Sequence, residues 1–421
     1  MRQMRGFNRL TRVDDALKIV FEHCGDRKPI VDNVSVNIAC GSVLESDIVT
    51  EVNVPPFDRS AVDGYAVKAA ETFSATMSNP AVFRLVGSLE SGGAKGKIAD
   101  GECFEIFTGA EIPRGADAVA MAEDCAREGN TIMVNKPVQK FANVSLRGED
   151  LKQGEVVIKK GEILKPWHIG ALASIGRKEV PVRVKPLVGV FSTGSELIDI
   201  TGAVEEKSDH IYDSTRPMII SLLKGIGCLV SDAGIAKDEP GELENKLECL
   251  KNEADLIITI GGTSVGGKDL VPEAVQSVSK NGLLFHGLAV KPGKPAGFGM
   301  MGSTPLFMLP GYPVSALVGY EAIVQPLICR WLGIPVPERK KVRAIMARRV
   351  PTTPGVRHIV RVVLSMRDSK QVATPIAITG SGLLSSITKA DGIVIVKEDL
   401  EGIEEGDDVE VELVRSWCQN A

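Results

Sequence analysis

The stretch that most constrains this chain runs from residue 255 to residue 315, where three apolar runs of strand type each end in a loop rich in glycine or proline. The loops read GGTSVGG, KPGKP and PGYPVS, and the last leads into a predicted helix. In open α/β sheets, ligands bind outside the carboxyl ends of the strands. Glycines let backbone N–H groups approach an anion, and a helix N-terminus adds a favourable dipole. We therefore expect these loops to meet at one crevice that binds an anion, with phosphate as the expected group.

The composition limits the classes of protein that this chain can belong to. Its 421 residues exceed one ordinary core, which predicts several domains. A net charge of −5 without a long basic run argues against nucleic acid as the main partner. The sequence shows neither an apolar run of roughly 20 residues nor the apolar core of a signal peptide, so we expect a cytoplasmic protein without a membrane partner. Eight scattered cysteines without a CxxC pair predict reduced core residues.

Local patterns along the first half of the chain predict a helix followed by β structure. Apolar spacing predicts a helix over residues 13–24, with two aspartates in its first turn. Short β-type runs separated by turn residues predict a small β-rich domain over residues 53–149. Residues 154–164 predict a hairpin, and a helix is expected over residues 166–175.

From residue 186 onward the pattern changes to alternating strands and helices, which predicts a mostly parallel sheet. Strands are predicted at 187–191 and 228–234, and helices at 214–225 and 241–252. After a proline-rich linker, residues 341–414 are again of β type.

Three loops in the first half of the chain carry polar residues with more than one interpretation. Asp63 lies beside Asp58 and Arg59 in PPFDRSAVDGYAV, which by itself also fits a turn stabilised by an Asp–Arg pair. Thr108 lies in FTGAEIP, a pattern that alone predicts only a hairpin. Asp150 ends RGED, which a solvated turn would also explain.

The STGSEL loop follows a predicted strand and contains Thr193, Gly194, Ser195 and Glu196. Small residues there suit contact with a phosphate or a pterin, and Glu196 follows where a cation could lie. A helix N-cap with an acidic first turn would use the same residues, so both interpretations stay open.

KPGKP places Lys291 and Lys294 three residues apart within a frame of two prolines and a glycine. Two ammonium groups held in this way can face one small oxyanion, although an ordinary surface turn is the alternative. Together with the carboxylates of Asp63, Asp150, Glu196 and Asp269, these lysines predict a divalent cation between phosphates. Mg²⁺ is the expected ion, since it commonly uses one or two carboxylates plus substrate phosphates.

Eight motifs occur in the order seen in one known family: PPFDRSAVDGYAV, TGAEIPRGADAV, RGEDL, STGSEL, IYDSTRP, GGTSVGGKD, KPGKP and LPGYPVSAL. The chain therefore resembles the molybdopterin molybdenumtransferases, which include the bacterial and archaeal MoeA proteins and the E domain of gephyrin. The resemblance runs from about Val13 to the C-terminus. It departs from the usual LPGNPVS at Tyr312 and, at Gly287, from the basic residue that some members carry.

The resemblance implies a multidomain α/β plus β fold with a central MogA-like α/β domain. The implied parts are an N-terminal elongated domain (1–52 and 150–184), a β-rich inserted domain (53–149), an α/β molybdopterin-binding domain with a mostly parallel sheet (185–333) and a C-terminal β-barrel-like domain (334–421).

The resemblance also implies roles for individual residues. The residues implied in activity are Asp63, Thr108, Asp150, Glu196, Asp238 and Asp269. Glu196, Asp269 and Asp63 are the implied Mg²⁺ ligands. The implied substrate-binding residues are Thr193, Gly194, Ser195, Asp213, Gly261, Gly262, Ser264, Lys291, Lys294, Pro310, Pro313, Ser315, Arg361 and Ser385, of which Lys291, Lys294, Ser315, Arg361 and Ser385 match the molybdate pocket.

The implied activity is insertion of molybdate into adenylylated molybdopterin with release of AMP, the final step of molybdenum cofactor biosynthesis. The implied assembly is a homodimer with a cleft shared between subunits. A non-catalytic scaffold and adenylyl transfer to molybdopterin are the alternatives; the acids and lysines argue against the first, and the β-rich insertion and C-terminal domain against the second. Molybdate and tungstate have nearly the same size and charge, so the sequence favours neither.

Overall fold

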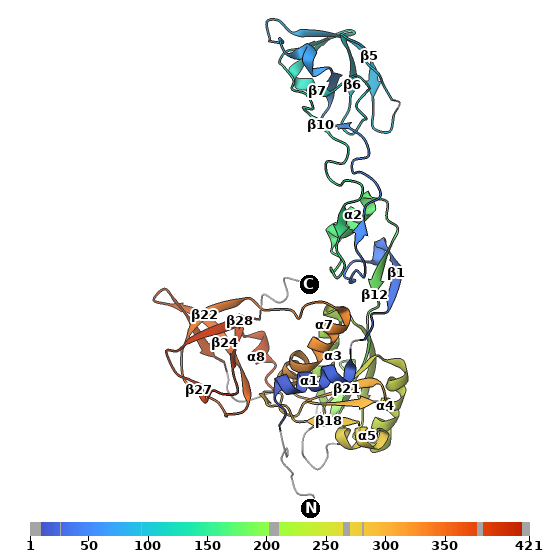
Figure 1. The fold of residues 1–421 in the computed structure, drawn as a ribbon. Helices are drawn as coiled ribbons and strands as arrows, with labels where there is room; N and C mark the ends of the chain where they lie inside the picture. The colour runs from blue at the N-terminus through green and yellow to red at the C-terminus, as the bar shows by residue number, and fades with distance from the viewer. Residues whose placement is uncertain are drawn as a thin grey trace, which may run out of the picture. The chain divides into compact units, whose positions relative to one another are not determined.

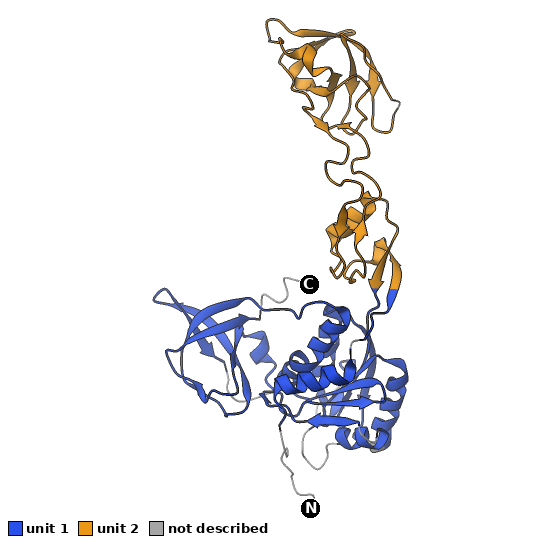
Figure 2. Ribbon diagram, viewed as in Figure 1, with its two compact units in different colours: residues 1–31, 183–421 blue, residues 32–182 orange. Residues whose placement is uncertain are grey.

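A computed structural model describes residues 10–25, 27–93, 95–201, 210–263, 270–279, 282–376 and 382–414. The chain divides into two compact units, one formed by residues 1–31 and 183–421 and the other by residues 32–182 (Figures 1 and 2). Within the residues described, no helix is long and apolar enough to cross a membrane. The division into four domains that the sequence implies stays a prediction.

The first unit contains the predicted α/β sheet, with strand order β16-β13-β17-β21-β20-β18. Its strands are β13 (Leu187–Thr193), β16 (Leu229–Ala236), β17 (Leu256–Ile260), β18 (Leu283–His286), β20 (Gly297–Met301) and β21 (Thr304–Leu309). The first four in spatial order are parallel, whereas β20 and β18 are added antiparallel. Every residue of β17 is buried, as expected for a strand covered on both faces. The predicted mostly parallel sheet is therefore confirmed.

Helices cover both faces of this sheet, and in Figure 1 α4 and α5 lie on one side while α3 and α7 lie on the other. The helices are α1 (Val13–Cys24), α3 (Thr215–Gly225), α4 (Pro240–Glu253), α5 (Val271–Val278), α6 (Pro313–Gly319), the π-helical turn η4 (Tyr320–Val324) and α7 (Gln325–Leu332). The predicted helices over 13–24, 214–225 and 241–252 are confirmed. A buried core that includes Phe191, Leu247 and Met308 joins the sheet to α4 and α5.

A second sheet in the same unit closes into a barrel through β24-β25-β22-β28-β26 and back to β24. Its strands are β22 (Lys341–Met346), β24 (Arg357–Arg367), β25 (Lys370–Pro375), β26 (Gly392–Val396) and β28 (Asp408–Leu413), with β19 (Val290–Lys291), β23 (Val350–Pro351), β27 (Gly402–Ile403) and the short helix α8 (Ser385–Thr388) beside them. The predicted β structure of residues 341–414 is thus confirmed as a barrel.

One expectation about the α/β sheet is wrong. The apolar run before KPGKP is not one continuous parallel strand of that sheet. Residues 283–286 form β18, an antiparallel edge strand, and residues 290–291 form β19, which pairs with β24 of the barrel sheet. The pairing partner of a short apolar run depends on distant residues, and the local pattern does not specify it.

The second unit contains a sheet with strand order β7-β4-β6-β5-β9-β8. These strands are β4 (Gly64–Val67), β5 (Ala81–Leu89), β6 (Glu102–Ile106), β7 (Ala118–Met121), β8 (Cys125–Glu128) and β9 (Thr131–Val134). Shorter elements are β1 (Val31–Ser35), β2 (Ile48–Val49), β3 (Arg59–Ser60), β10 (Val144–Ser145), β11 (Val156–Ile158), β12 (Glu179–Arg183), the helix α2 (Pro166–Ser174), the 3₁₀ turns η1 (Val36–Ile38), η2 (Ala69–Thr72) and η3 (Ala122–Asp124), and, in the first unit, β14 (Leu197–Ile198) and β15 (Ile211–Tyr212).

Two predicted hairpins in the second unit are wrong, whereas the predicted helix over 166–175 is confirmed as α2. In the first hairpin, β11 pairs with β2, and Ile163 bridges to Val43, so residues 154–164 pair with an earlier segment instead of with one another. In the second, β6 and β7 on either side of the Thr108 loop both pair with β4, which lies between them. Both errors come from long-range pairing that turn residues do not reveal.

Gly64 offers a test of the packing in the second unit. An added Cβ would lie 2.0 Å from the backbone oxygen of Ala120 on the neighbouring strand, so Gly64→Ala must push β4 away from β7. Overpacking of this kind costs about 1–3 kcal/mol or more, and we expect faster amide hydrogen exchange along β4, β6 and β7. Gly170→Ala in α2 is the control, because nothing lies within 4 Å of its Cβ position. Equal exchange in both variants would contradict the predicted clash.

Candidate functional site

A pocket of about 570 Å³ opens at the carboxyl ends of β13, β17 and β21. Among the residues implied by the sequence, it is lined by Thr193, Gly194, Glu196, Asp213, Asp238, Gly261, Gly262, Pro310 and Pro313. The other lining residues are Ser192, Leu197, Ile211, Tyr212, Ser214, Thr215, Ile260, Thr263, Pro295, Gly311, Tyr312, Gly382 and Leu384. Ser264 and Asp269 lie outside the described residues. The sequence assigned no role to the aromatic and apolar members of this set, although Leu197, Tyr212 and Tyr312 lie within the motifs STGSEL, IYDSTRP and LPGYPVSAL.

Two glycines let the end of β17 lie against the end of β13. Gly261 and Gly262 have φ angles of 92° and 59°, in the left-handed region that favours glycine. A Cβ on Gly261 would lie 2.5 Å from the backbone oxygen of Thr193, and a Cβ on Gly262 would lie 2.8 Å from the Thr193 methyl group. The two strand ends therefore need the absence of side chains here. The N–H of Gly261 donates to the backbone oxygen of Leu309 at 2.9 Å, and both glycines line the pocket.

Two carboxylates, those of Asp238 and Glu196, belong to the same pocket. Asp238 accepts hydrogen bonds from the hydroxyl of Thr193 (2.7 Å) and from the N–H of Ser195 (3.4 Å). The Glu196 carboxylate folds back over Gly194, where an added Cβ would meet both of its oxygens at 2.9 Å. These contacts fix the STGSEL loop around two acids.

The donor set of this loop fits Mg²⁺ only if a substrate completes the coordination. No group of three or more His, Cys, Asp or Glu side chains that could hold a metal occurs among the described residues. Mg²⁺ is commonly bound through one or two carboxylates together with substrate phosphates and water. Glu196 and Asp238, which line one pocket, supply that number of carboxylates.

A buried arginine that the sequence argument did not single out organises one wall of the pocket. Arg216 of α3 is 4% exposed, and its Nε donates to Asp213 at 3.0 Å. Its two terminal nitrogens donate to Asp232 of β16 and to Asp199. Arg216 therefore joins both ends of the segment between β14 and α3 to the edge of the sheet. Arg216 lies in IYDSTRP, three residues after Asp213, but its other partners Asp199 and Asp232 lie outside this motif, so the motif alone does not reveal the network.

Asp213, an implied substrate-binding residue, is 3% exposed and already occupied by local contacts. Its Oδ1 accepts the N–H groups of Thr215 (3.2 Å) and Arg216 (3.1 Å), and its Oδ2 accepts from the Arg216 side chain. The hydroxyl of Thr215 donates to the backbone oxygen of Gly311 at 2.7 Å, which links α3 to the loop after β21. Asp213 thus shapes the pocket by holding the start of α3.

The residues implied for molybdate are distributed over α6 and the barrel, and they do not line the pocket described above. Lys291 ends β19 opposite His358 of β24, Arg361 lies on β24 at 6% exposure, and Ser385 begins α8. Burial lowers the pKa of Arg361, and burial together with nearby Lys291 lowers that of His358.

The KPGKP loop itself lies next to α6. A Cβ on Gly293, between Lys291 and Lys294, would lie 3.5 Å from the backbone oxygen of Ser315, and it would lie 2.9 Å from the side chain of Val290. Ser315 is buried, whereas both lysines are exposed. The structure thus brings the lysine loop together with Ser315.

Asp63 and Thr108 form a local pair in the second unit. Oδ1 of Asp63 accepts the backbone N–H of Thr108 at 2.7 Å and its hydroxyl at 2.8 Å, and these two bonds hold the pKa of Asp63 below its usual value. Asp58 accepts the N–H of Arg147 at 2.7 Å, which joins the PPFDRS loop to RGED. Asp150, at the end of RGED, is exposed. The motifs of this unit are therefore tied to one another through carboxylates.

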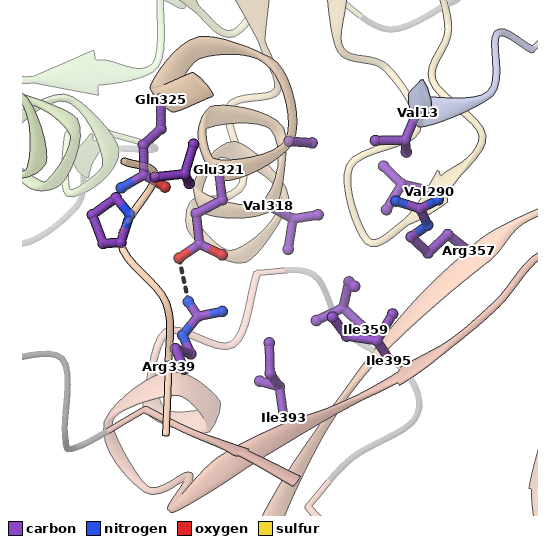
Figure 3. A pocket seen from close by; sticks show the side chains of 13 residues that line it. Val13, Val290, Val318, Glu321, Gln325, Arg339, Arg357, Ile359, Ile393 and Ile395 are labelled. Atoms are coloured by element: carbon purple, nitrogen blue, oxygen red, sulfur yellow. Dashed lines mark hydrogen bonds and ion pairs between the residues drawn. The ribbon is translucent and has the colours of Figure 1, made fainter. Parts of the chain in front are cut away.

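A smaller cavity of about 210 Å³ lies at the junction of the α/β part and the barrel, and Figure 3 shows its lining. Val318, Ile393 and Ile395 form apolar walls, and the dashed contact in the figure joins Glu321 of η4 to Arg339. Burial raises the pKa of Glu321, which the Arg339 guanidinium opposes. None of the site residues implied by the sequence lines this cavity. It belongs to the packing between the two parts.

This chain, with an α/β sheet that has a pocket at its strand ends and with a β barrel joined to it, matches known families over three regions. Residues 11–176 match the family model described as the MoeA N-terminal region (domains I and II). Residues 189–330 match a probable molybdopterin binding domain, and residues 343–414 match the MoeA C-terminal region (domain IV).

Relatives extend over nearly the whole chain. A putative molybdopterin biosynthesis protein from Methanocaldococcus jannaschii is 35% identical over 98% of this chain and 100% of its own length. A molybdopterin molybdenumtransferase from Staphylococcus aureus is 31% identical over 91% of each chain. The crystal structure of a molybdopterin biosynthesis MoeA protein from Pyrococcus horikoshii has a TM-score of 0.78 and 32% identity, covering 96% of this chain and 99% of that one. The chain belongs to the MoeA family.

The Arg216 network predicts a specific loss of order in the pocket wall. Arg216→Met leaves three carboxylates without their shared cation, and we expect a loss of about 2–3 kcal/mol, less than for a fully buried network because Asp199 and Asp232 are half exposed. Hydrogen exchange should accelerate at residues 197–201 and 210–216. Arg216→Lys, which keeps one charge but loses the planar fork, should show an intermediate effect.

Arg349→Met is the matched control, because Arg349 forms an exposed pair with Glu404 that should contribute little. Unchanged exchange of the pocket wall in both Arg216 variants would contradict the assigned role.

The Asp63–Thr108 pair predicts a pH effect with a defined sign. A carboxyl group whose pKa is lowered by folding stabilises the fold above its unfolded pKa, near 3.9, and loses that contribution as the pH falls through its folded pKa. Thr108→Val removes the hydroxyl donor but keeps the backbone donor, which is the larger cause of the lowered pKa of Asp63. The pKa of Asp63, followed by carboxyl NMR, should therefore rise in Thr108→Val without reaching its ordinary value. An identical titration in both proteins would refute the hydroxyl contact.

Proposed function

We propose that this protein is a molybdopterin molybdenumtransferase, which inserts molybdate into adenylylated molybdopterin and releases AMP in the final step of molybdenum cofactor biosynthesis. The observation that carries the proposal is the pocket at the ends of β13, β17 and β21, with its Gly261-Gly262 backbone beside two acids. Its volume of about 570 Å³ lies within the range of pockets that bind compact organic ligands. The identity of the proposed substrate is taken from the family to which the chain belongs.

The proposed roles follow from where each group lies. The N–H of Gly261 already donates to the backbone oxygen of Leu309, so the pyrophosphate of the substrate is proposed to lie against the backbone of Gly262, and the hydroxyl of Thr193 positions Asp238 in the same pocket. Glu196 and Asp238, with Asp269 and Asp63 as the family resemblance implies, would hold Mg²⁺. When bound, the ion would offset negative charge on the phosphates.

Molybdate, as substrate, is proposed to bind near Lys291 and Lys294, next to Ser315, with Arg361 and Ser385 as further contacts. Molybdate is a dianion, and a small dianion leaving water needs positive charge close to it. The KPGKP loop, which lies against α6, supplies that charge. Tungstate would fit the same group of donors, since its size and charge are nearly the same.

The proposed assembly is a cytoplasmic homodimer with a cleft shared between subunits, in which Asp63, Thr108 and Asp150 of one subunit serve the pocket of the other. We propose a shared cleft because the acids implied in activity belong to two different compact units of the chain. A symmetric dimer would give two such clefts.

Glu196→Ala and Asp63→Ala test the proposed chemistry. Each variant should lose AMP release in the presence of molybdate and Mg²⁺ by ~10²–10³-fold while remaining folded, because a positioned electrostatic group is removed. Glu248→Ala, which removes an exposed acid paired with Lys251, is the control and should remain active. Wild-type turnover in both site variants would refute the assignment of these acids.

Mixing the two inactive variants tests the shared cleft. After subunit exchange, half of the dimers are mixed and each mixed dimer holds one intact cleft, so activity should return to roughly a quarter of the wild-type value. A mixture that stays inactive although mixed dimers form would overturn the shared cleft and leave the assignment of each acid standing.

A further inference from the structure

Tyr312 is an exposed aromatic residue that lines the pocket at the carboxyl ends of the strands. It immediately precedes α6, and its side chain is 63% exposed. Tyr212 of β15 lines the same pocket and is also exposed, as is its neighbour Ile211. Aromatic rings have a large apolar surface that is usually covered by packing or by a ligand. Exposed aromatic rings at the wall of a pocket therefore indicate an apolar surface that is available to a ligand.

One edge of the Tyr312 ring lies against Gly382, in the C-terminal part of the chain. A Cβ built on Gly382 would lie 3.1 Å from Cδ1 and 3.2 Å from Cε1 of Tyr312. The ring edge thus lies close to the backbone of residue 382, and a Cβ there would require the ring to shift by a few tenths of an ångström. Leu384, two residues further on, lines the same pocket. This contact orients the ring while leaving most of its surface uncovered.

The backbone of Tyr312 is fixed as well. Its carbonyl accepts the N–H of Ala316 at 2.9 Å in the first turn of α6, and the preceding Gly311 accepts the hydroxyl of Thr215. The ring therefore projects from a loop held by α3 on one side and α6 on the other. A preorganised ring loses little conformational entropy when a ligand binds.

The polar and apolar groups of the pocket are arranged for different parts of a ligand. The glycines and acids at the strand ends suit phosphate and its cation, whereas Tyr312, Tyr212 and Leu384 offer apolar surface. Stacking of a base on an aromatic side chain tolerates any fused heterocycle, because each presents a flat π-face.

We propose that Tyr312, together with Tyr212, forms an aromatic platform that stacks on a planar fused-ring nitrogen heterocycle of the substrate, and that Tyr312 is a specificity-determining residue of this chain. The inference rests on the proposed function for the identity of the ring, which is the pterin or the adenine of adenylylated molybdopterin. No covalent step is involved. The ring of Tyr312 positions the heterocycle while the strand-end loops hold the phosphates.

The experiment measures binding of two simple probes to the full chain. Pterin-6-carboxylate, whose fluorescence is quenched by stacking, and AMP are titrated into the wild type and into Tyr312→Phe, Tyr312→Leu and Tyr312→Asn. Tyr312→Phe should bind and quench like the wild type, whereas the other two should lose roughly tenfold in affinity for the stacked probe. The probe whose affinity falls identifies whether the pterin or the adenine of the substrate stacks on Tyr312. Inorganic pyrophosphate should bind equally to all four proteins.

Gly382 supplies a test that does not remove the ring. Gly382→Val should displace the Tyr312 ring and weaken the stacked probe, but it should have no further effect in the Tyr312→Leu background, because the two residues act through one contact. Phe73→Leu, which changes an exposed aromatic residue of the other compact unit, is the control for general effects of surface substitution.

The outcomes separate this inference from the proposed function. If the wild type releases AMP on addition of molybdate but Tyr312→Leu keeps the affinity and quenching of both probes, the aromatic platform is refuted and the enzymatic assignment stands. If stacking depends on Tyr312 but molybdate never triggers AMP release, the platform stands and the proposed reaction fails. An unchanged KM of Tyr312→Asn for adenylylated molybdopterin would also refute a role in specificity.

Discussion

The parallel pairing of β17 with β13 and β21 is the constraint on which the pocket depends. Every residue of β17 is buried, so the strand must be covered on both faces and bonded on both sides. Parallel pairing then brings three carboxyl ends to one edge of the sheet. Because the ends of β13 and β17 meet there, a Cβ on Gly261 would lie only 2.5 Å from the backbone oxygen of Thr193. This crowding therefore requires glycine at the end of β17, and the same glycine lines the pocket.

The sequence predicts this sheet well and its surroundings less well, for a physical reason. Strands covered on both faces appear as continuous apolar runs, as in Leu256–Ile260, and the alternation with helices then specifies parallel order. The run before KPGKP looks similar but contributes β18 and β19 to two different sheets. Residues 154–164 likewise pair with the segment around residues 43–49. In both cases the outcome depends on partners distant in the chain.

The residues of the candidate site likewise fall into those that the sequence predicts and those that it does not. Gly261, Gly262 and the STGSEL loop could be predicted because their chemistry is local to a strand end. Arg216 could not, because it acts by joining Asp199, Asp213 and Asp232, which become neighbours only after α3 packs on the sheet. Arginine is rarely buried unless it is paired, so a single sequence places it on the surface by default. The wall of the pocket thus depends on an interaction that no local motif describes.

The charges of the side chains that line the pocket determine how it could bind a phosphate. Asp213 is neutralised by Arg216, but no lysine or arginine occurs among the described residues that line the pocket, where Glu196 and Asp238 remain. A phosphate entering such a wall meets two negative charges, which would repel it in a partly dry space. A divalent cation between acid and phosphate, as proposed above, would convert this repulsion into attraction. The proposed cation would thus give the acids at the strand ends a role in binding phosphate, and the same proposal assigns the lysines of KPGKP to a second anion.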